Sequence, residues 1–445
     1  MTKRRILLIL LLAAAVRFGL VAAVWNQPRR IYKPDSFSYV ELMSNLGETL
    51  RFERDDRPEI FRTPGYPVFL LYGQLFGHND WRAILISQAA LDVLLVYLTY
   101  LLGSVLVNRA AGAWVAAFQA VTPVSVAAAL HLLTDSLFAL LLLLSLASLV
   151  LHLRTGRWGH LFWCGILLVM ACYVRPAGLA AAAVFLVTVL LRPRRLRRAG
   201  LLAALLLAGL GPWVVRNGLA AEYWGYSSFA GDSMYFFAVP EVKARVEGGD
   251  PAALRRRLKN EAEPRPGPDG ELPPPGPAAV ERRRKAVRTL MEHPGLYARL
   301  HLQGCLGVYL PAGPEVLELL GVTAGQRGTS DVLRKEGVVP AARHYFGDRT
   351  GVLVAAAAMA LIPLLKYLAA VGWVLRSFWR RMPAEIYVCA ALVVVYTLLP
   401  GPFGLPRYRV PIAPLLSIAA GGGVAGLIAW LRRPRRGKPK LSVAE

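Results

Sequence analysis

Residues 134–152 read TDSLFALLLLLSLASLVLH, an almost wholly apolar run, and a helix needs about 20 such residues to cross a membrane. The run is one of several along the chain. Further apolar stretches lie at 6–25, 82–107, 112–131, 159–174, 177–192, 199–216, 351–375, 383–400 and 408–431. The sequence therefore predicts an all-α polytopic membrane protein with about ten transmembrane helices.

Composition supports a membrane protein over a soluble one. Of the 445 residues, 55% are hydrophobic and 18% are charged, whereas soluble domains average about 25% charged residues. The formal net charge of +24 would suggest a nucleic-acid partner in a soluble chain. Here the basic residues gather before the first apolar run and between later runs, as in Lys3–Arg5 and Arg192–Arg198, which is the pattern of cytoplasmic segments. We therefore expect cytoplasmic termini and no nucleic-acid binding.

The predicted organisation has four parts. Residues 1–216 form an N-terminal membrane module of about seven helices, and residues 217–350 form a small extracytoplasmic region. Residues 351–431 supply the last transmembrane helices, and residues 432–445 form a basic cytoplasmic tail.

Two hydrophilic segments lie outside the membrane in this topology. The first outer loop, 26–81, contains a predicted helix around Ser38–Gly47. In the extracytoplasmic region, a flexible Pro-rich insert is expected at 262–278 and a surface helix at His293–Pro311.

Two features of the first apolar run bear on processing. Basic residues precede it, as in a secretory signal, but its length and the embedded Arg17 favour an uncleaved anchor. Arg17 and Lys366, both within apolar runs, are expected to snorkel or to pair locally.

Cysteine and histidine exclude two kinds of chemistry. The four cysteines form no Cys-x-x-Cys pair, and the seven histidines form no His-Glu-x-x-His motif. Thiol and zinc mechanisms are therefore not expected. The stretch Gly421–Gly426 satisfies G-x-G-x-x-G, but it lies within an apolar run, so we interpret it as a helix-packing motif.

Polar residues gather at the ends of the apolar runs that face outward. Ionisable groups at membrane depth are costly and usually mark a functional site. The clusters are Pro34-Asp35-Ser36 with Tyr39, Arg62-Thr63-Pro64-Gly65-Tyr66-Pro67, Leu133-Thr134-Asp135-Ser136, Arg175-Pro176, Pro212-Trp213 with Arg216-Asn217, and Arg407-Tyr408-Arg409. Their common side predicts a site at the outer face of the membrane.

The order of these motifs resembles the C-type (GT-C) glycosyltransferase superfamily, in particular bacterial relatives of protein O-mannosyltransferases and of lipid A aminoarabinose transferases. The resemblance spans nearly the whole chain apart from the Pro-rich insert. It implies a GT-C-like helical bundle that takes a sugar from a polyprenyl-phosphate carrier. The sugar would pass to a hydroxyl of an acceptor lipid, glycan or protein at the outer face of the bacterial plasma membrane.

The resemblance also implies residue roles. Asp35 and Asp135 are the predicted catalytic residues, with Asp35 as the base that takes a proton from the acceptor hydroxyl. Cationic side chains would stabilise the phosphate leaving group. The predicted substrate-binding residues are Tyr39, Arg62, Tyr66, Arg175, Arg216, Arg407, Tyr408 and Arg409.

Other interpretations of the same residues stay open. Asp35 and Asp135 are also suited to helix caps, and Arg175, Arg216 and Arg407 to interfacial anchors. The two aspartates could hold Mg²⁺, Mn²⁺ or Ca²⁺, while the arginines could neutralise the phosphate without a metal. A transporter or flippase of lipid-linked sugars is the alternative function, although a transporter should spread its polar residues across the bilayer.

Overall fold

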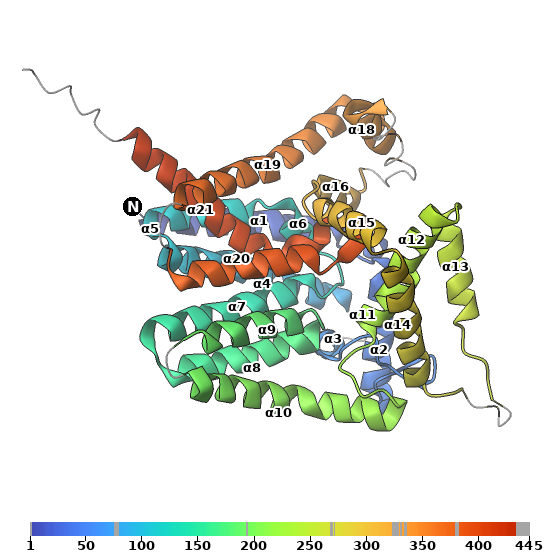
Figure 1. Ribbon diagram of the computed structural model, residues 1–445. Coiled ribbons are helices and arrows are strands. Elements are labelled where there is room, and N and C mark those ends of the chain that lie inside the picture. Colours follow the sequence, from blue (N-terminus) through green and yellow to red (C-terminus); the bar gives the residue numbers. More distant parts are fainter. Residues whose placement is uncertain are drawn as a thin grey trace, which may run out of the picture.

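The protein is described from a computed structural model, which covers residues 2–74, 80–192, 195–267, 270, 272–322, 329, 332, 336–378 and 382–432. The predicted tail therefore lies, beyond Arg432, outside the described residues. Figure 1 shows long helices running roughly parallel, with shorter helices gathered at one end of the bundle. The all-α architecture is confirmed, because the described strands are a single two-residue pair, β1 (Glu53–Arg54) and β2 (Arg57–Pro58).

Six described helical segments are long and apolar enough to cross a membrane: Lys3–Val24, Trp81–Leu106, Asp135–Thr155, Arg195–Ala221, Thr350–Ser377 and Pro406–Leu431. Shorter apolar helices lie between them. In the N-terminal module the helices are α1 (Thr2–Val24), α4 (Trp81–Leu106), α5 (Arg109–Ala120), α6 (Pro123–Ala128), α7 (Asp135–Thr155), α8 (Trp158–Val174), α9 (Gly178–Leu190) and α10 (Arg195–Ala221). The chain is thus a polytopic membrane protein.

One predicted transmembrane helix is divided in the structure. The apolar stretch 112–131 separates into α5 and α6, because Pro123 has no N–H to continue the helix. Backbone groups released inside a membrane need new partners. Arg17 on α1 supplies one, since its Nη1 donates to Ala120 O at 2.7 Å, and Lys366 Nζ donates to Thr122 Oγ1 at 3.1 Å.

The same two cations are paired inside the bundle, as the sequence indicated. Arg17 Nη2 lies 2.6 Å from Asp92 Oδ2 on α4, and both side chains are fully buried. Lys366 Nζ also donates to Ala413 O at 2.9 Å. The two cations therefore connect α1, α4, α19 (Thr350–Phe378) and α21 (Ala413–Leu431) around the break.

The first outer loop contains several short elements within its described residues, 26–74 and 80–81. It contains η1 (Pro28–Arg30), α2 (Pro34–Thr49), the β1–β2 pair and α3 (Gly65–Gln74). The predicted helix around Ser38–Gly47 is confirmed and extends by several residues at its N-terminal side. In Figure 1, α2 and α3 lie at the same end of the bundle as α11 (Phe229–Ser233), α14 (Pro275–Glu292) and α15 (Pro294–Gly307).

The region between the two membrane modules is helical throughout most of its described length. Its elements are α11 (Phe229–Ser233), the π-helical turn η2 (Met234–Ala238), α12 (Val239–Val246), α13 (Pro251–Glu261), α14 (Pro275–Glu292), α15 (Pro294–Gly307), α16 (Gly313–Leu319) and α18 (Val338–Phe346). The helix predicted at His293–Pro311 is α15, which begins at Pro294 and ends earlier than predicted, at Gly307. The Pro-rich insert ends earlier than predicted, because α14 begins at Pro275, and proline is tolerated in the first helical turn.

The C-terminal helices pack through small residues. They are α19 (Thr350–Phe378), α20 (Ala384–Leu398), the 3₁₀ turns η3 (Gly401–Phe403) and η4 (Pro406–Ile412), and α21 (Ala413–Leu431). The Gly-rich motif lies within α21, as interpreted from the sequence. A Cβ on Gly423 would overlap the backbone oxygen of Ala369 on α19, so the two helices touch backbone to backbone there.

We expect Gly423→Ala to destabilise the fold by about 1–3 kcal/mol, because the added methyl group forces α19 and α21 apart. Thermal unfolding of the purified protein in detergent measures the effect. Gly372→Ala is the matched control, since nothing lies within 4 Å of a Cβ there. Equal unfolding temperatures for the two variants would contradict the close helix contact.

Candidate active site

Asp35 is the second residue of α2 and is held by two arginines from distant parts of the chain. Its Oδ1 accepts from Arg62 Nη2 at 2.9 Å, and its Oδ2 accepts from Arg407 Nη2 at 2.5 Å. The helix cap is instead Lys33, whose N–H donates to Ser36 Oγ at 2.9 Å. Asp35 is therefore not the N-cap. Its side chain is 34% exposed, so a ligand can reach the carboxylate.

Contacts hold both the guanidinium group and the backbone of Arg62 in place. Its Nη1 donates to Tyr39 OH at 3.0 Å, and its guanidinium lies 4.6 Å from the centre of the Tyr39 ring. Its backbone N–H donates to Glu59 Oε1 at 3.1 Å. Gly65, three residues later, allows the loop to touch the backbone of Tyr173 at the end of α8, where a Cβ would clash. The Arg62-Thr-Pro-Gly motif therefore positions its arginine.

A second acidic residue pairs with a third arginine beside this group. Asp135 is the first residue of α7, after Thr134 as N-cap, and its Oδ1 accepts from Arg175 Nη1 at 2.5 Å. The Tyr408 ring joins the two pairs, because the Arg175 and Arg407 guanidinium carbons lie 5.7 and 5.3 Å from its centre. The Asp135 side chain is only 3% exposed. A ligand can thus reach Asp35 but not Asp135.

The charges around Asp35 keep it ionised. Burial opposes its charge, but the positive charges of Arg62 and Arg407 outweigh burial and lower the pKa of Asp35 to about 2. Arg62 shows the reciprocal effect: burial disfavours its charge, yet Tyr39 and Asp35 raise the pKa of its guanidinium.

The lowered pKa predicts a pH dependence. Because the folded pKa of Asp35 lies below the usual 3.8, its ionised form stabilises the fold above about pH 4, and that contribution is lost as pH falls towards about 2. We therefore expect no loss of kcat/KM through Asp35 between about pH 8 and about pH 4. A pH–rate profile measures this, with circular dichroism as the folding control. If kcat/KM of the folded protein fell reversibly with a midpoint above about pH 5, that result would contradict the ion pairing.

Two donors in this group have no partner among the described residues. The Nε atoms of Arg62 and Arg407 are buried and make no hydrogen bond there. Buried donors of this kind are rare in native structures. The Arg62 and Arg407 side chains are 12% and 23% exposed, so an oxyanion such as phosphate can reach other N–H groups of the two guanidinium ions.

Three residues predicted to bind substrate make other contacts. Arg216 donates to Glu59 O at 2.8 Å and Phe52 O at 2.5 Å, and Arg409 donates to Val308 O at 2.8 Å. Tyr66 is fully buried, and its OH donates to Gln88 Oε1 at 2.7 Å. Each supports the surrounding backbone or packing, and we leave all three out of the proposed site.

The structure adds acidic residues that sequence reasoning missed. Lys33 Nζ lies 3.1 Å from Glu318 Oε2 on α16, which places this helix beside the start of α2. Burial raises the pKa of Glu315 on the same helix, while the charges of Lys33 and Arg407 oppose that shift. The only signal in the sequence was Lys33 itself, two residues before Asp35.

Among the described residues, the two aspartates are not grouped with further metal ligands. Within the described ranges, no three or more His, Cys, Asp or Glu side chains are grouped to hold a metal ion. Both Asp35 oxygens and one Asp135 oxygen accept from guanidinium groups. These contacts favour charge neutralisation by arginine over metal coordination.

Comparison with known proteins gives a family match and structural neighbours. Residues 63–215, about a third of the chain, match the family model of dolichyl-phosphate-mannose-protein mannosyltransferases. No curated protein sequence matches significantly. Archaeal oligosaccharyltransferase AglB from Archaeoglobus fulgidus, in complex with an inhibitory peptide and a dolichol-phosphate, aligns with a TM-score of 0.53 at 14% identity. That alignment covers 96% of this chain but 50% of the neighbour, so the chain spans about half the length of the oligosaccharyltransferase.

A second neighbour is ArnT from Cupriavidus metallidurans bound to undecaprenyl phosphate, with a TM-score of 0.41 at 15% identity, covering 97% of this chain and 81% of that one. The helical architecture, the mannosyltransferase match and the oligosaccharyltransferase superposition agree with the motif order seen in the sequence. The chain resembles the GT-C glycosyltransferases and has their fold.

Proposed function

We propose that the chain transfers a sugar from a polyprenyl-phosphate-linked donor to an acceptor hydroxyl. The observation that carries this proposal is the partly exposed Asp35 carboxylate held between Arg62 and Arg407. It combines a proton acceptor with two guanidinium groups suited to phosphate. The matching family, named for dolichyl-phosphate-mannose, and the dolichol-phosphate in the oligosaccharyltransferase complex support this donor class.

The transfer proceeds as a substitution at the anomeric carbon of the sugar. The acceptor oxygen forms a bond to that carbon, and the bond from the carbon to the phosphate oxygen breaks with its electron pair. The proton of the acceptor hydroxyl passes to the Asp35 carboxylate. Arg62 and Arg407 stabilise the negative charge that grows on the leaving polyprenyl phosphate.

The ion pairs connect donor binding to base strength. Before a donor phosphate binds Arg62 and Arg407, the pKa of Asp35 is about 2, so its carboxylate is a weak base. A donor phosphate bound by the partly exposed guanidinium groups of Arg62 and Arg407 shares their charge and adds a negative charge nearby. Both changes raise the proton affinity of Asp35. The carboxylate therefore gains basicity once the donor is in place.

Asp135 is assigned a positioning role. It is almost fully buried and binds Arg175, which in turn lies over the Tyr408 ring beside Arg407. Loss of Asp135 would leave Arg175 uncompensated. Asp135 therefore orients the cationic side of the site, while Asp35 reacts.

We propose that the reaction takes place at the outer face of the bacterial plasma membrane. Basic runs such as Arg192–Arg198 and the tail from Arg432 to Lys440 support cytoplasmic termini. With the N-terminus inside, α2 follows the first transmembrane helix and lies outside with Asp35. Labelling of single introduced cysteines at Asp55 and at Arg195 in intact cells tests this assignment: reagent that does not cross the membrane should modify the first position only.

The envelope of cells with and without the gene tests the function and identifies the acceptor. Mass spectrometry should find one sugar substituent missing in the deletion strain and restored by the parent gene. Restoration by Asp35→Asn to the parent level would contradict a transferase that uses this carboxylate. Loss of a whole class of lipid-linked sugar at the outer face, with no missing linkage, would instead support a flippase.

We expect transfer to continue after exhaustive chelation, because guanidinium groups already bind the oxygens of Asp35 and Asp135 that a metal would need. Initial rates measured before and after dialysis against EDTA should agree within about twofold. An inactive chelated protein that recovers only with added Mg²⁺, Mn²⁺ or Ca²⁺ would contradict the arginine assignment.

A further inference from the structure

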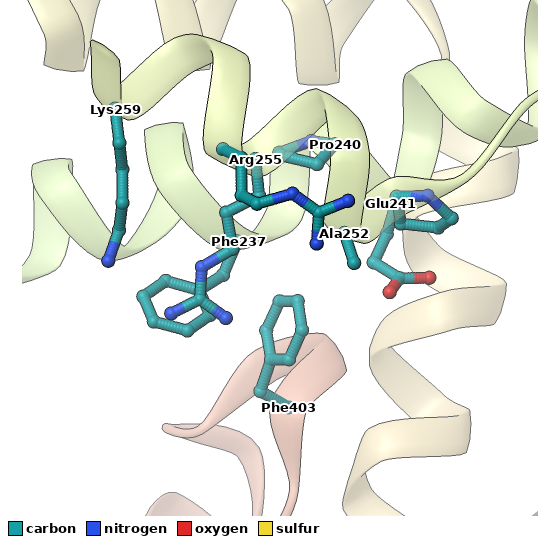
Figure 2. Close-up of a pocket in the computed structure, with 9 residues that line it drawn as sticks. Phe237, Pro240, Glu241, Ala252, Arg255, Lys259 and Phe403 are labelled. Carbon is teal, nitrogen blue, oxygen red and sulfur yellow. The ribbon is translucent and has the colours of Figure 1, made fainter. Parts of the chain in front are cut away.

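A pocket of about 350 Å³ lies where the region between the membrane modules meets η3 of the C-terminal module. Its volume falls in the range of small-molecule sites, roughly 300–1,000 Å³. Figure 2 shows Phe237 and Phe403 close together, with Lys259 on one side of them and Glu241 on the other. The lining comes from η2, α12, α13 and η3, all outside the six candidate spans.

The pocket is cationic. Arg255, Arg256 and Lys259 line it from α13, and the one acidic residue among the described lining residues, Glu241, is already bound by Arg245 at 3.2 Å. Arg256 lies 3.8 Å from Asp250, and both of these side chains are exposed. Within the part of the chain that the structure describes, Arg255 and Lys259 have no carboxylate partner. The pocket therefore carries unneutralised positive charge.

Arg255 is held in place by an aromatic ring. Its guanidinium carbon lies 3.4 Å from the centre of the Phe237 ring, and Phe237 meets Phe403 edge to face at 5.0 Å. Stacking uses the flat face of a guanidinium and leaves its N–H edge free to bind an oxyanion through two hydrogen bonds. A cation fixed in advance also loses less conformational entropy when its ligand binds.

The pocket is connected to the proposed active site through one short segment. Phe403 ends η3, and Arg407, which binds Asp35, lies four residues later in η4. The segment is held at the pocket because η3 packs against α15 and η2. A ligand in the pocket thus lies against the same short segment that carries Arg407.

We propose that this pocket binds an oxyanion group, phosphate or carboxylate, on the saccharide acceptor of the reaction. This inference rests on the proposed function, in which Arg62 and Arg407 hold the donor phosphate and leave the pocket for the acceptor. Its charged lining, outside the candidate spans, suits a hydrophilic ligand and not a prenyl chain. The acceptor class is therefore an anionic glycan or glycolipid headgroup.

Binding of three small probes to the full-length protein in nanodiscs tests the proposal. Undecaprenyl phosphate is added first so that Arg62 and Arg407 are occupied, and saturation-transfer NMR then gives Kd for glucose 6-phosphate, glucuronate and glucose. We expect at least one anionic probe to bind roughly tenfold or more tightly than glucose, as a charge-assisted contact implies. Preference for glucose 6-phosphate identifies phosphate as the bound group, and preference for glucuronate identifies carboxylate.

Arg255→Gln should abolish that preference. Arg257→Gln is the matched control on the same helix, because Arg257 is exposed, pairs with Glu261 at 2.7 Å and does not line the pocket. Arg255→Lys, which keeps the charge but loses the planar fork, should fall between them. Equal binding of glucose and both anions, or equal effects of the two glutamine variants, would overturn the proposal.

The binding readout separates this proposal from the transferase itself. A protein that prefers anions through Arg255 yet transfers no sugar would count against the proposed function alone. A protein that transfers sugar but shows no anion preference would count against the pocket alone.

Discussion

Asp35→Asn should lower the rate of sugar transfer by roughly 10²–10⁴-fold, because it removes the proton acceptor while nearly preserving side-chain size. The fold should survive, since the cap of α2 is made by Lys33 and Ser36. Donor affinity should stay within about threefold of the parent, because Arg62 and Arg407 still provide donors for phosphate. Single-turnover kinetics with a radiolabelled sugar donor separates the two quantities.

The control for this change is Asp55→Asn, in the same outer loop. Asp55 is 81% exposed and lies 3.6 Å from Arg54, outside the Asp35 group. It should leave both the transfer rate and donor affinity unchanged. A folded Asp35→Asn protein with a transfer rate within about threefold of the parent would remove Asp35 from the chemistry. Equal losses of rate and donor affinity would make Asp35 a positioning residue for the arginines.

Arg407→Ala should weaken donor binding and slow turnover together. A lost charge-assisted contact to phosphate costs roughly ten- to hundredfold in affinity. Turnover falls further because the negative charge that grows on the leaving phosphate is less stabilised. Donor titration and single-turnover rates on the same preparation measure both effects.

Two further variants serve as controls for Arg407→Ala. Arg407→Lys should recover part of the affinity, because it restores charge without the bidentate geometry. Arg284→Ala, at an exposed position paired with Glu281 on α14, should change neither quantity. Unchanged donor affinity in Arg407→Ala would mean that Arg407 serves only to hold Asp35.

Helix positions were the most predictable part of the structure. Apolar runs of fixed length determine where helices can cross a membrane, and the ends of most runs agree with the helices to within a few residues. The division of 112–131 was missed because hydropathy continues through Pro123. The polar contacts that make the break tolerable come from Arg17 and Lys366, and a hydropathy profile does not report hydrogen bonds made by side chains.

The site was predictable in part. Motif order and a shared membrane side brought Asp35, Arg62, Asp135, Arg175 and Arg407 to one region, although Asp35 and Arg407 lie 372 residues apart. Which arginines face that region depends on side-chain packing. Arg409, two residues after Arg407, binds backbone carbonyls instead.

Glu315 and Glu318 lie near the site, but the sequence did not predict them there. They carry no motif in the sequence, and they come close to the start of α2 only because α16 packs there, as the contact between Lys33 and Glu318 shows.

The fate of the bond between sugar and phosphate tests the central claim most directly. Purified protein in nanodiscs is supplied with a radiolabelled polyprenyl-phosphate sugar and a lipid and glycan extract of the envelope, and the products are separated by chromatography. We predict that label moves to an acceptor while polyprenyl phosphate is released in equal amount, and that Asp35→Asn blocks both. Intact donor in the presence of every acceptor fraction, together with movement of the same lipid-linked sugar across proteoliposome membranes, would contradict the account.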